Sequence, residues 1–256
     1  MIKTINGAIM IIARMGSTRL DRKHLIDVNG EPIISYLIRR MKYFFKKEIE
    51  DEQLTISIVT GSKEKNSLLG EVAKNFDISI FYGNDINIPL RINQFVTKYN
   101  YDFVISIDGE NTFCAPEGIK KVYNQMMASR KYVKTDGYPF GMNSMGFSKR
   151  FIMESTSCLK KSMLETGWDW VFDINECHKI VNKNKTDERL RFTLDYIEDL
   201  EFYKSIILSD LDIISASTDE IINLVLKRKF FLKNMDLNKT YWERFNKLKQ
   251  KEIRRN

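Results

Sequence analysis

The chain has 256 residues, of which 43% are apolar and 29% are charged, and this composition excludes a disordered protein. Its length suits one large α/β domain, or one domain with a small appendage. No apolar run approaches the ~20 residues that a membrane-spanning helix needs, and the first residues do not form a charged-then-apolar leader, so we expect a cytoplasmic protein without a transmembrane segment. The cysteines and histidines are too few and too scattered for a zinc framework: Cys114, Cys158, Cys177, His24 and His178.

The formal net charge of +7 is concentrated near the carboxyl end of the chain. Residues 227–256 contain eleven Lys or Arg and three Asp or Glu, so the remaining residues together are close to neutral, and we expect no nucleic-acid partner. This tail predicts an amphipathic helix with a basic face. A helix that packs on the protein with its lysine stems is favoured over one that binds a membrane surface or an acidic partner. Its apolar positions are Tyr241, Trp242, Phe245 and Leu248.

In chain order, apolar runs alternate with segments of helical periodicity. Alternation with crossovers of this length implies a mostly parallel sheet with right-handed connections. In such sheets, ligands bind beyond the carboxyl ends of the strands. The expected strands are residues 8–13, 54–60, 78–81 and 103–107, and the expected helices are residues 32–47, 63–76 and 89–99.

Residues 131–185 break this alternation with scattered glycines and a proline. We expect this region to be an insertion that covers the site and contributes to a dimer contact. Regular structure is expected to resume with a strand at residues 190–194 and a helix that begins near Ile197. The chain is thus divided into one α/β domain at residues 1–226 and a basic helical tail at residues 227–256.

The first loop, Ala13 to Lys23, follows a buried strand and precedes a helical segment. It combines Gly, Ser and Thr with four cations, which is a plausible seat for a polyphosphate, because backbone N–H groups and basic side chains can surround the anion. The loop lacks the spacing of a Walker A or GxGxxG motif. The alternative is an exposed surface loop. The cations are Arg14, Arg19, Arg22 and Lys23.

Carboxylates follow two other expected strands. Asp108 and Glu110 are separated by Gly109, so in extended backbone they point the same way and can hold one Mg²⁺. The alternative is an exposed acidic turn. Asp195 ends the later strand and could complete the metal site, whereas Glu198 and Asp199 are typical of a first helical turn. A cationic loop with convergent carboxylates is the equipment of nucleotidyl transfer, which requires no side-chain nucleophile.

Several segments resemble the cytidylyltransferases, including the spore-coat-polysaccharide type and the CMP-Kdo synthetases of the acylneuraminate cytidylyltransferase superfamily. Residues 11–34 resemble the opening of that family and residues 191–200 its terminal motif. The resemblance covers about residues 7 to 205 and implies a three-layer α/β/α, Rossmann-like fold of the nucleotide-diphospho-sugar transferase type. Weaker likenesses lie at residues 82–85, 89–91, 103–116 and 138–141.

The resemblance also implies CTP, Mg²⁺ and an acidic sugar as ligands, release of pyrophosphate, and a homodimer. Arg14, Lys23 and Asp195 would be catalytic, and Asp108, Glu110 and Asp195 would hold the metal. Tyr138 and Asn143 would contact the acceptor. The implied nucleotide-binding residues are Ala13, Arg14, Met15, Gly16, Ser17, Arg19, Lys23, Thr60, Gly61, Ser62 and Arg91.

The sequence departs from the family pattern at several positions. Asp21-Arg22 replaces Pro-Gly, and Glu110 replaces an aspartate. Three carboxylates of the family's YPDGLDVE segment are replaced by Phe140, Asn143 and Met145, so we expect an unusual acceptor. Two alternatives remain open. One is a GT-A-type glycosyltransferase that uses a nucleotide sugar with Asp108-Gly109-Glu110 as its metal motif, and the other is a diverged, non-catalytic nucleotide-binding module.

Overall fold

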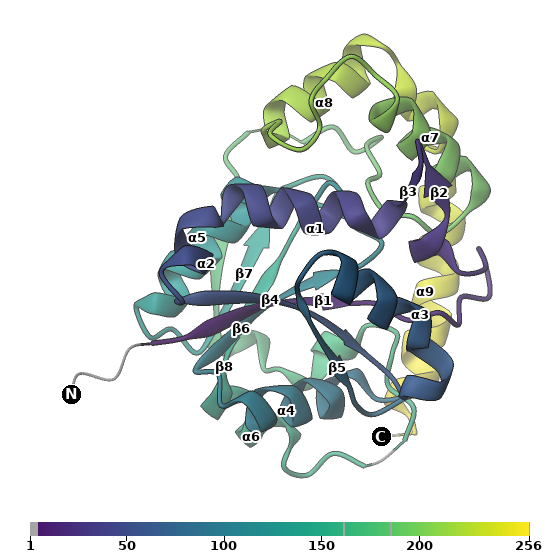
Figure 1. Cartoon of the computed structure of the whole chain (residues 1–256). Helices are drawn as coiled ribbons and strands as arrows, with labels where there is room; N and C mark the ends of the chain where they lie inside the picture. The colour runs from purple at the N-terminus through teal and green to yellow at the C-terminus, as the bar shows by residue number, and fades with distance from the viewer. Residues whose placement is uncertain (1–4, 161, 185, 256) are drawn as a thin grey trace.

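The computed structural model describes residues 5–160, 162–184 and 186–255. Its centre is a seven-stranded mixed sheet with the order β5-β4-β1-β6-β8-β7-β9 (Figure 1). Strand β1 pairs in parallel with β4 and β6, and β4 with β5, while β8 is antiparallel to both of its neighbours. The strands are β1 (Gly7–Ile12), β4 (Leu54–Thr60), β5 (Ser79–Tyr82), β6 (Phe103–Asp108), β7 (Tyr132–Asp136), β8 (Met145–Ser148) and β9 (Cys177–Val181), with a separate hairpin of β2 (Asp27–Val28) and β3 (Glu31–Pro32).

Helices cover both faces of the sheet and extend beyond it (Figure 1). The α-helices are α1 (Ile33–Phe44), α2 (Lys46–Glu50), α3 (Lys63–Asn75), α4 (Ile88–Tyr99), α5 (Pro116–Met127), α6 (Lys149–Thr156), α7 (Ile197–Ile207), α8 (Thr218–Lys227) and α9 (Leu237–Ile253). Short 3₁₀ turns are η1 (Lys23–Leu25), η2 (Trp168–Val171), η3 (Ile174–Glu176) and η4 (Phe230–Lys233).

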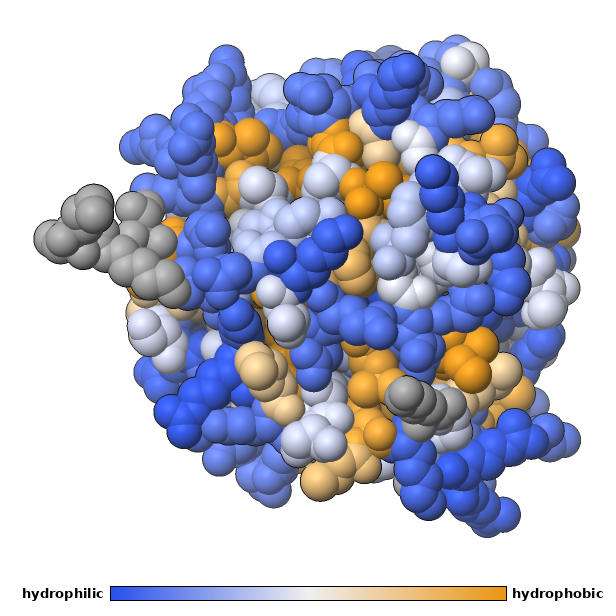
Figure 2. All heavy atoms as spheres, turned by 60° about the horizontal axis from the view of Figure 1, so that its bottom comes forward, coloured by the Kyte–Doolittle hydropathy of each residue, from blue (hydrophilic) through white to orange (hydrophobic). Residues whose placement is uncertain are grey.

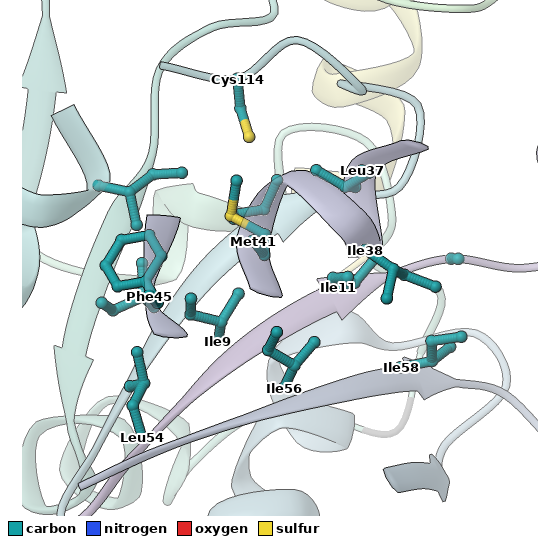
Figure 3. Packing of buried hydrophobic residues seen from close by; sticks show 14 of the residues in the cluster. Ile9, Ile11, Leu37, Ile38, Met41, Phe45, Leu54, Ile56, Ile58 and Cys114 are labelled. Atoms are coloured by element: carbon teal, nitrogen blue, oxygen red, sulfur yellow. The ribbon is translucent and has the colours of Figure 1, made fainter. Parts of the chain in front are cut away.

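The alternation of side chains along β1 explains the layers. Ile9 and Ile11 point into a core shared with α1, whose Leu37 packs on the sheet (Figure 3). Ala8 and Met10 point to the opposite face, into a core shared with α4 and α6. Because successive strand residues face opposite sides, a strand buried on both faces must be apolar throughout, as β1 is. The predicted three-layer α/β/α fold is confirmed.

The predicted strands and helices before residue 110 form close to their expected bounds, and three later expectations differ. Residues 190–194 are not a strand, since Arg191 makes only an isolated bridge to Phe140. Helix α5 was not expected. Residues 131–185 are more regular than expected, because they supply β7, β8 and β9 to the central sheet, and the role of this region as a cover of the site stays a prediction. Short strands interrupted by glycine hid this pattern, and Gly146 is required where an added Cβ would lie 2.6 Å from Val122 of α5.

A third core lies beyond the sheet, where α7 and α8 pack on Phe113 and Phe192. Figure 1 places these two helices above α1. The face that carries α4 and α6 is mainly hydrophilic, with small apolar areas between charged side chains (Figure 2). Within the described ranges, no helix is long and apolar enough to cross a membrane.

Candidate active site

The site begins where β1 and β6 end side by side. Gly109 donates its backbone N–H to the Ile12 carbonyl at 2.7 Å, which joins the two strand ends. A Cβ at Gly109 would lie 2.9 Å from the Cβ of Ala13 and 3.1 Å from the imidazole of His24. Only glycine therefore permits this approach, and it brings Asp108 and Glu110 next to the first loop.

A buried ion cluster lies beside these strand ends. Asp195 is 1% exposed and accepts hydrogen bonds from Arg19 and from Lys23, whose Nζ lies 3.0 Å from Oδ1. The same Nζ lies 3.4 Å from Oε2 of Glu110. Arg191 approaches the other Asp195 oxygen at 3.3 Å. The structure thus brings together four of the predicted residues, Arg19, Lys23, Glu110 and Asp195, and the ammonium group of Lys23 lies between two carboxylates.

Asp199 fixes the position of Asp195. Its carboxylate accepts the backbone N–H groups of Asp195 and Tyr196, both at 3.0 Å, at the start of α7. It also pairs with Arg191 at 2.9 Å, and Asn234 donates to it at 2.9 Å. Residue 199 is therefore a helix cap, as its first-turn position predicts, and it orients the loop that carries Asp195.

The protonation of the cluster follows from its charges. Burial opposes ionisation of Asp195, but Lys23 and Arg19 overcome it and hold its pKa below the usual value. Burial likewise opposes the charge on Lys23, yet Glu110 and Asp195 raise its pKa. Asp108 differs, because burial and the neighbouring Glu110 raise its pKa to about 7. Burial thus favours the neutral form of Asp108 more than that of a carboxyl group in water.

Aromatic rings enclose the guanidinium groups of the cluster. The guanidinium carbon of Arg19 lies 5.6 Å from the ring centroid of Tyr196 and 5.8 Å from that of Tyr241. The corresponding carbon of Arg191 lies 4.6 Å from Tyr241 and 5.2 Å from Phe140. These distances are those of cation–π contacts.

An open pocket of about 500 Å³ adjoins the first part of the loop, a size typical of small-molecule sites. Gly61 can line it only as glycine, because a Cβ there would lie 2.4 Å from the Asp85 carboxylate. Asn66 accepts the backbone N–H of Met15 at 2.9 Å and so orients the loop. The lining residues are Arg14, Met15, Gly16, Arg22, Gly61, Glu64, Lys65, Asn66, Ser67, Leu68, Asp85 and Ile86.

Other predicted nucleotide-binding residues have structural contacts. The Ser17 hydroxyl accepts the backbone N–H of Leu20 at 3.3 Å. Thr60 is fully buried at the end of β4. Ser62 donates its backbone N–H to Asp85 at 2.6 Å, and Arg91 is buried and donates to the carbonyls of residues 84 and 85 at 2.7 and 2.9 Å. None of these four residues lines the pocket itself, whereas Ser62 and Arg91 contact its lining residue Asp85.

The two predicted acceptor residues lie apart from the ion cluster. The ring of Tyr138 lies against Gly118 of α5, where a Cβ would be 3.2 Å away. Asn143 donates to the backbone carbonyl of Tyr138 at 3.2 Å. Instead, Phe140 of the same segment faces the site. Gly141, with φ of +89°, brings this segment so close to Phe192 that a Cβ would overlap the Phe192 carbonyl.

The loop differs from the expected strand–loop–helix cradle. After the loop come η1 and the β2–β3 hairpin, so α1 begins only at Ile33 and its N-terminus does not follow the loop directly. Arg22 has φ of 46° and ψ of 34°, which is the left-handed conformation that favours glycine. The family pattern has glycine at this position. Arg22 therefore adopts the same left-handed backbone conformation, although glycine adopts it at a lower free-energy cost.

Sequence reasoning missed several residues of the site. Tyr241 belongs to the tail helix, which was expected to pack, but nothing indicated where. Arg14 pairs with Glu165 at 2.6 Å, and Glu165 comes from the region with the least regular pattern. Arg191 lies within the terminal motif but was not assigned a role. These contacts join segments far apart in the chain, which local spacing does not predict.

The fold is a three-layer α/β/α fold with a mixed sheet, and a cationic loop follows β1 at the carboxyl ends of the parallel strands. The family model described as Cytidylyltransferase matches residues 8–169. The chain therefore belongs to the cytidylyltransferase family.

Individual relatives agree with this assignment. Uncharacterized protein MJ1063 of Methanocaldococcus jannaschii is 23% identical over 90% of this chain and 93% of its own length. The 3-deoxy-manno-octulosonate cytidylyltransferase of Francisella philomiragia is 31% identical, over 46% of this chain and 44% of its own. Spore coat polysaccharide biosynthesis protein SpsF of Bacillus subtilis is 27% identical, over 44% of this chain and 47% of its own.

Solved structures share the fold. A cytidylyltransferase from Leptospira borgpetersenii superposes with a TM-score of 0.77 at 20% identity, over 90% of this chain and 98% of that one. A CMP:2-keto-3-deoxy-manno-octonic acid synthetase in complex with CTP gives a TM-score of 0.58 at 12% identity, over 80% and 100% of the two chains.

Proposed function

We propose that this protein transfers CMP from CTP to a sugar acid or a related precursor of a surface polysaccharide, with release of pyrophosphate. The observation that carries the proposal is the ammonium group of Lys23, buried between Glu110 and Asp195 at the carboxyl ends of the parallel strands. Family membership supports CTP as the nucleotide, and the names of two relatives, SpsF and the octulosonate cytidylyltransferase, support the acceptor class.

The pocket beside Met15 and Gly61 would hold the base and ribose of CTP, since it is open and lies next to the loop. Arg14 lines this pocket, so its guanidinium can leave Glu165 for a phosphate. Arg19 and Lys23 would neutralise the rest of the triphosphate. These two cations would stabilise the negative charge that develops on the leaving pyrophosphate. The stabilisation is stronger than in water because the site is partly buried.

The carboxylates fit a divalent cation. Among the described residues no three carboxylate, imidazole or thiol groups form a ready-made metal cluster. Lys23 and Arg19 both bond Oδ1 of Asp195, and Arg191 approaches Oδ2. The position between Glu110 and Asp195 already holds a positive charge, the ammonium group of Lys23. We propose that Glu110 and Asp195, with Asp108 beside them, hold Mg²⁺ once the two basic side chains turn to the phosphates. The ion would supply charge neutralisation at the triphosphate.

A calorimetric titration with CTP and Mg²⁺ tests the nucleotide half of the proposal. We expect Lys23→Met to weaken binding at least tenfold, because a charge that faces the phosphates is lost while the stem is kept. Lys46→Ala is the matched control, since Lys46 is an exposed cation on α2 and should leave binding unchanged. Equal binding by the wild type and Lys23→Met would contradict the assignment of Lys23.

Turnover tests the acceptor half. With CTP, Mg²⁺ and a panel of keto-sugar acids, we expect pyrophosphate release with at least one acceptor. CTP binding without turnover would favour a non-catalytic nucleotide-binding module. Stronger binding of a nucleoside-diphosphate sugar than of CTP would favour the glycosyltransferase alternative, and no nucleotide binding at all would overturn the proposal.

The homodimer implied by the family likeness stays a prediction. Strand β9 ends the sheet on one side, and Val181 at its end is 60% exposed. An exposed edge strand can pair with a second copy. Light scattering after size exclusion measures the mass directly, and a mass of one chain would contradict the homodimer.

A further inference from the structure

Helix α9 lies across the carboxyl end of β1, next to the first loop (Figure 1). It follows the part of the chain that the family model matches, which ends at residue 169. Its inward side carries Tyr241, and its outward side carries most of the basic residues of the tail, such as Lys247. The helix therefore belongs to the site by position, although neither the fold nor the catalytic proposal has given it a role.

Contacts at both ends hold α9 in place. Near its start, the rings of Tyr241 and Trp242 pack at a tilt against Phe140, with ring centroids 5.0 and 4.9 Å away. Near its end, the carboxylate of Glu252 is buried and accepts the backbone N–H groups of Glu165 and Thr166 at 2.7 and 2.8 Å. Phe140 stands where the family pattern has a carboxylate, so this substitution supplies the apolar surface on which the helix packs.

Tyr241 is the residue of α9 that reaches the ion cluster. Its ring lies 4.6 Å from the guanidinium carbon of Arg191 and 5.8 Å from that of Arg19. The ring is largely buried, and burial raises the pKa of its phenol, with Asp195 and Glu110 adding to the effect. Trp242 also packs against Phe140 but is 42% exposed, and it makes no cation–π contact with either arginine in the part of the chain described.

We propose that Tyr241 is a positioning residue of the active site, which orients Arg19 toward the bound triphosphate and shields the cluster from water. This inference rests on the proposed function for the identity of the anion. An aromatic face over a guanidinium restricts its orientation and keeps its N–H edge free for an anion. The Nε of Arg19 is buried without a hydrogen-bond partner among the described residues, so one donor is available for this purpose.

The test measures CTP·Mg²⁺ affinity by calorimetry in three variants. Tyr241→Ala is expected to weaken binding about fivefold, the size of a partly buried cation–π contact. Tyr241→Phe keeps the ring and should bind within twofold of the wild type. Trp242→Ala is the matched control. It removes the other ring that packs against Phe140, and it should not change CTP affinity. Thermal unfolding of each variant reports the structural effect separately.

A double-mutant cycle shows whether Tyr241 acts through Arg19. In the Arg19→Ala background, Tyr241→Ala should cause no further loss of CTP affinity. Equal losses in both backgrounds, or an equal loss in Trp242→Ala, would overturn the proposal and leave Tyr241 as a packing residue. Should Tyr241→Ala fail to fold, Tyr241→Leu replaces it in the cycle, with the same expected loss.

The proposed function and this inference can fail separately. If the wild type binds no CTP, the proposed function is wrong, and the same variants are titrated with sodium tripolyphosphate as the isolated anion. Weaker tripolyphosphate binding by Tyr241→Ala, with recovery in Tyr241→Phe, would still support the positioning role. Absence of tripolyphosphate binding, or equal binding by all variants, would overturn it.

Discussion

The two halves of the first loop differ in how their charges are held. Arg14 and Gly16 border an open pocket, and the side chain of Arg14 is 48% exposed. Arg19 and Lys23 lie in the ion cluster, where the Lys23 side chain is only 7% exposed and shares two carboxylates. The first half of the loop borders an open pocket that can hold a ligand. In the second half the basic side chains are already paired with carboxylates, so an anionic ligand must compete with those carboxylates for them.

Replacing a charged residue should therefore have different consequences in the two halves of the loop. Arg14 is half-exposed, and water screens its pairing with Glu165, so its replacement should affect ligand binding more than folding. A buried ion pair is different, because removing one partner leaves the other charge without compensation in a medium of low dielectric constant. Variants in the second half of the loop should therefore affect stability and function together.

Asp195→Asn is expected to have the largest effect. The substitution leaves Arg19, Lys23 and Arg191 with one anion fewer, so we expect the free energy of unfolding to fall by about 3 kcal/mol. Pyrophosphate release should be lost as well. Urea unfolding measures the stability, and a pyrophosphate assay measures the turnover.

Asp187→Asn is the matched control for this loss of stability. Asp187 pairs with Arg189 at 2.6 Å, but the Arg189 side chain is 56% exposed. The cost should therefore stay below about 1 kcal/mol. Equal destabilisation by the two substitutions would break the distinction between a buried cluster and a surface pair.

Acid should destabilise the buried half through His24. Burial, together with Lys23, lowers the pKa of its imidazole to about 3, against about 6.5 in the unfolded chain. A lowered folded-state pKa means that the unfolded state takes up the proton first, so stability is present above pH 6.5 and is lost as the pH falls toward 3. Between pH 7 and pH 4 this loss amounts to roughly 3 kcal/mol.

Urea unfolding at several pH values checks the contribution of His24. In His24→Gln the stability should fall less between pH 7 and pH 4 than in the wild type. His178→Gln, at the other histidine, serves as the control and should keep the wild-type dependence. If the free energy of unfolding of His24→Gln depends on pH as in the wild type, the His24 imidazole is not the group that causes the loss of stability in acid.

Much of the fold was predictable because its first half uses strong local patterns. The strands at residues 54–60 and 103–107 are apolar runs, and the helices between them repeat apolar residues every three or four positions. The second half of the chain lacks such strong local patterns. Strand β8 has only four residues and includes Gly146, and residues 190–194 alternate apolar and polar side chains but form an isolated bridge at Arg191 and no strand. Tertiary contacts, rather than local propensity, decide these segments.

The sequence predicted the site residues that directly follow strands. It did not predict the contacts between segments that lie far apart in the chain. The loop of Lys23 and the turn of Glu110 follow apolar runs, so the sequence places both at one edge of the sheet. The pairing of Arg14 with Glu165, and of Arg191 with Tyr241, joins residues that no local spacing connects. The full pairing of Asp195 with basic side chains was also unforeseen, because spacing predicts proximity but not which charges meet.

Arg22→Gly is expected to have the smallest effect and the opposite sign. Arg22 lies between the two halves of the loop and adopts φ of 46°, a conformation that costs a residue with a Cβ roughly 1 kcal/mol and costs glycine much less. Among the described residues, its side chain forms an ion pair with Asp21 alone, which is exposed and 3.8 Å long, so its loss should cost little stability. We expect the free energy of unfolding to rise by about 0.5 to 1 kcal/mol. Asp21→Gly, whose backbone is not left-handed, should give no such gain, and a loss in both variants would show that the conformation of Arg22 stores no strain.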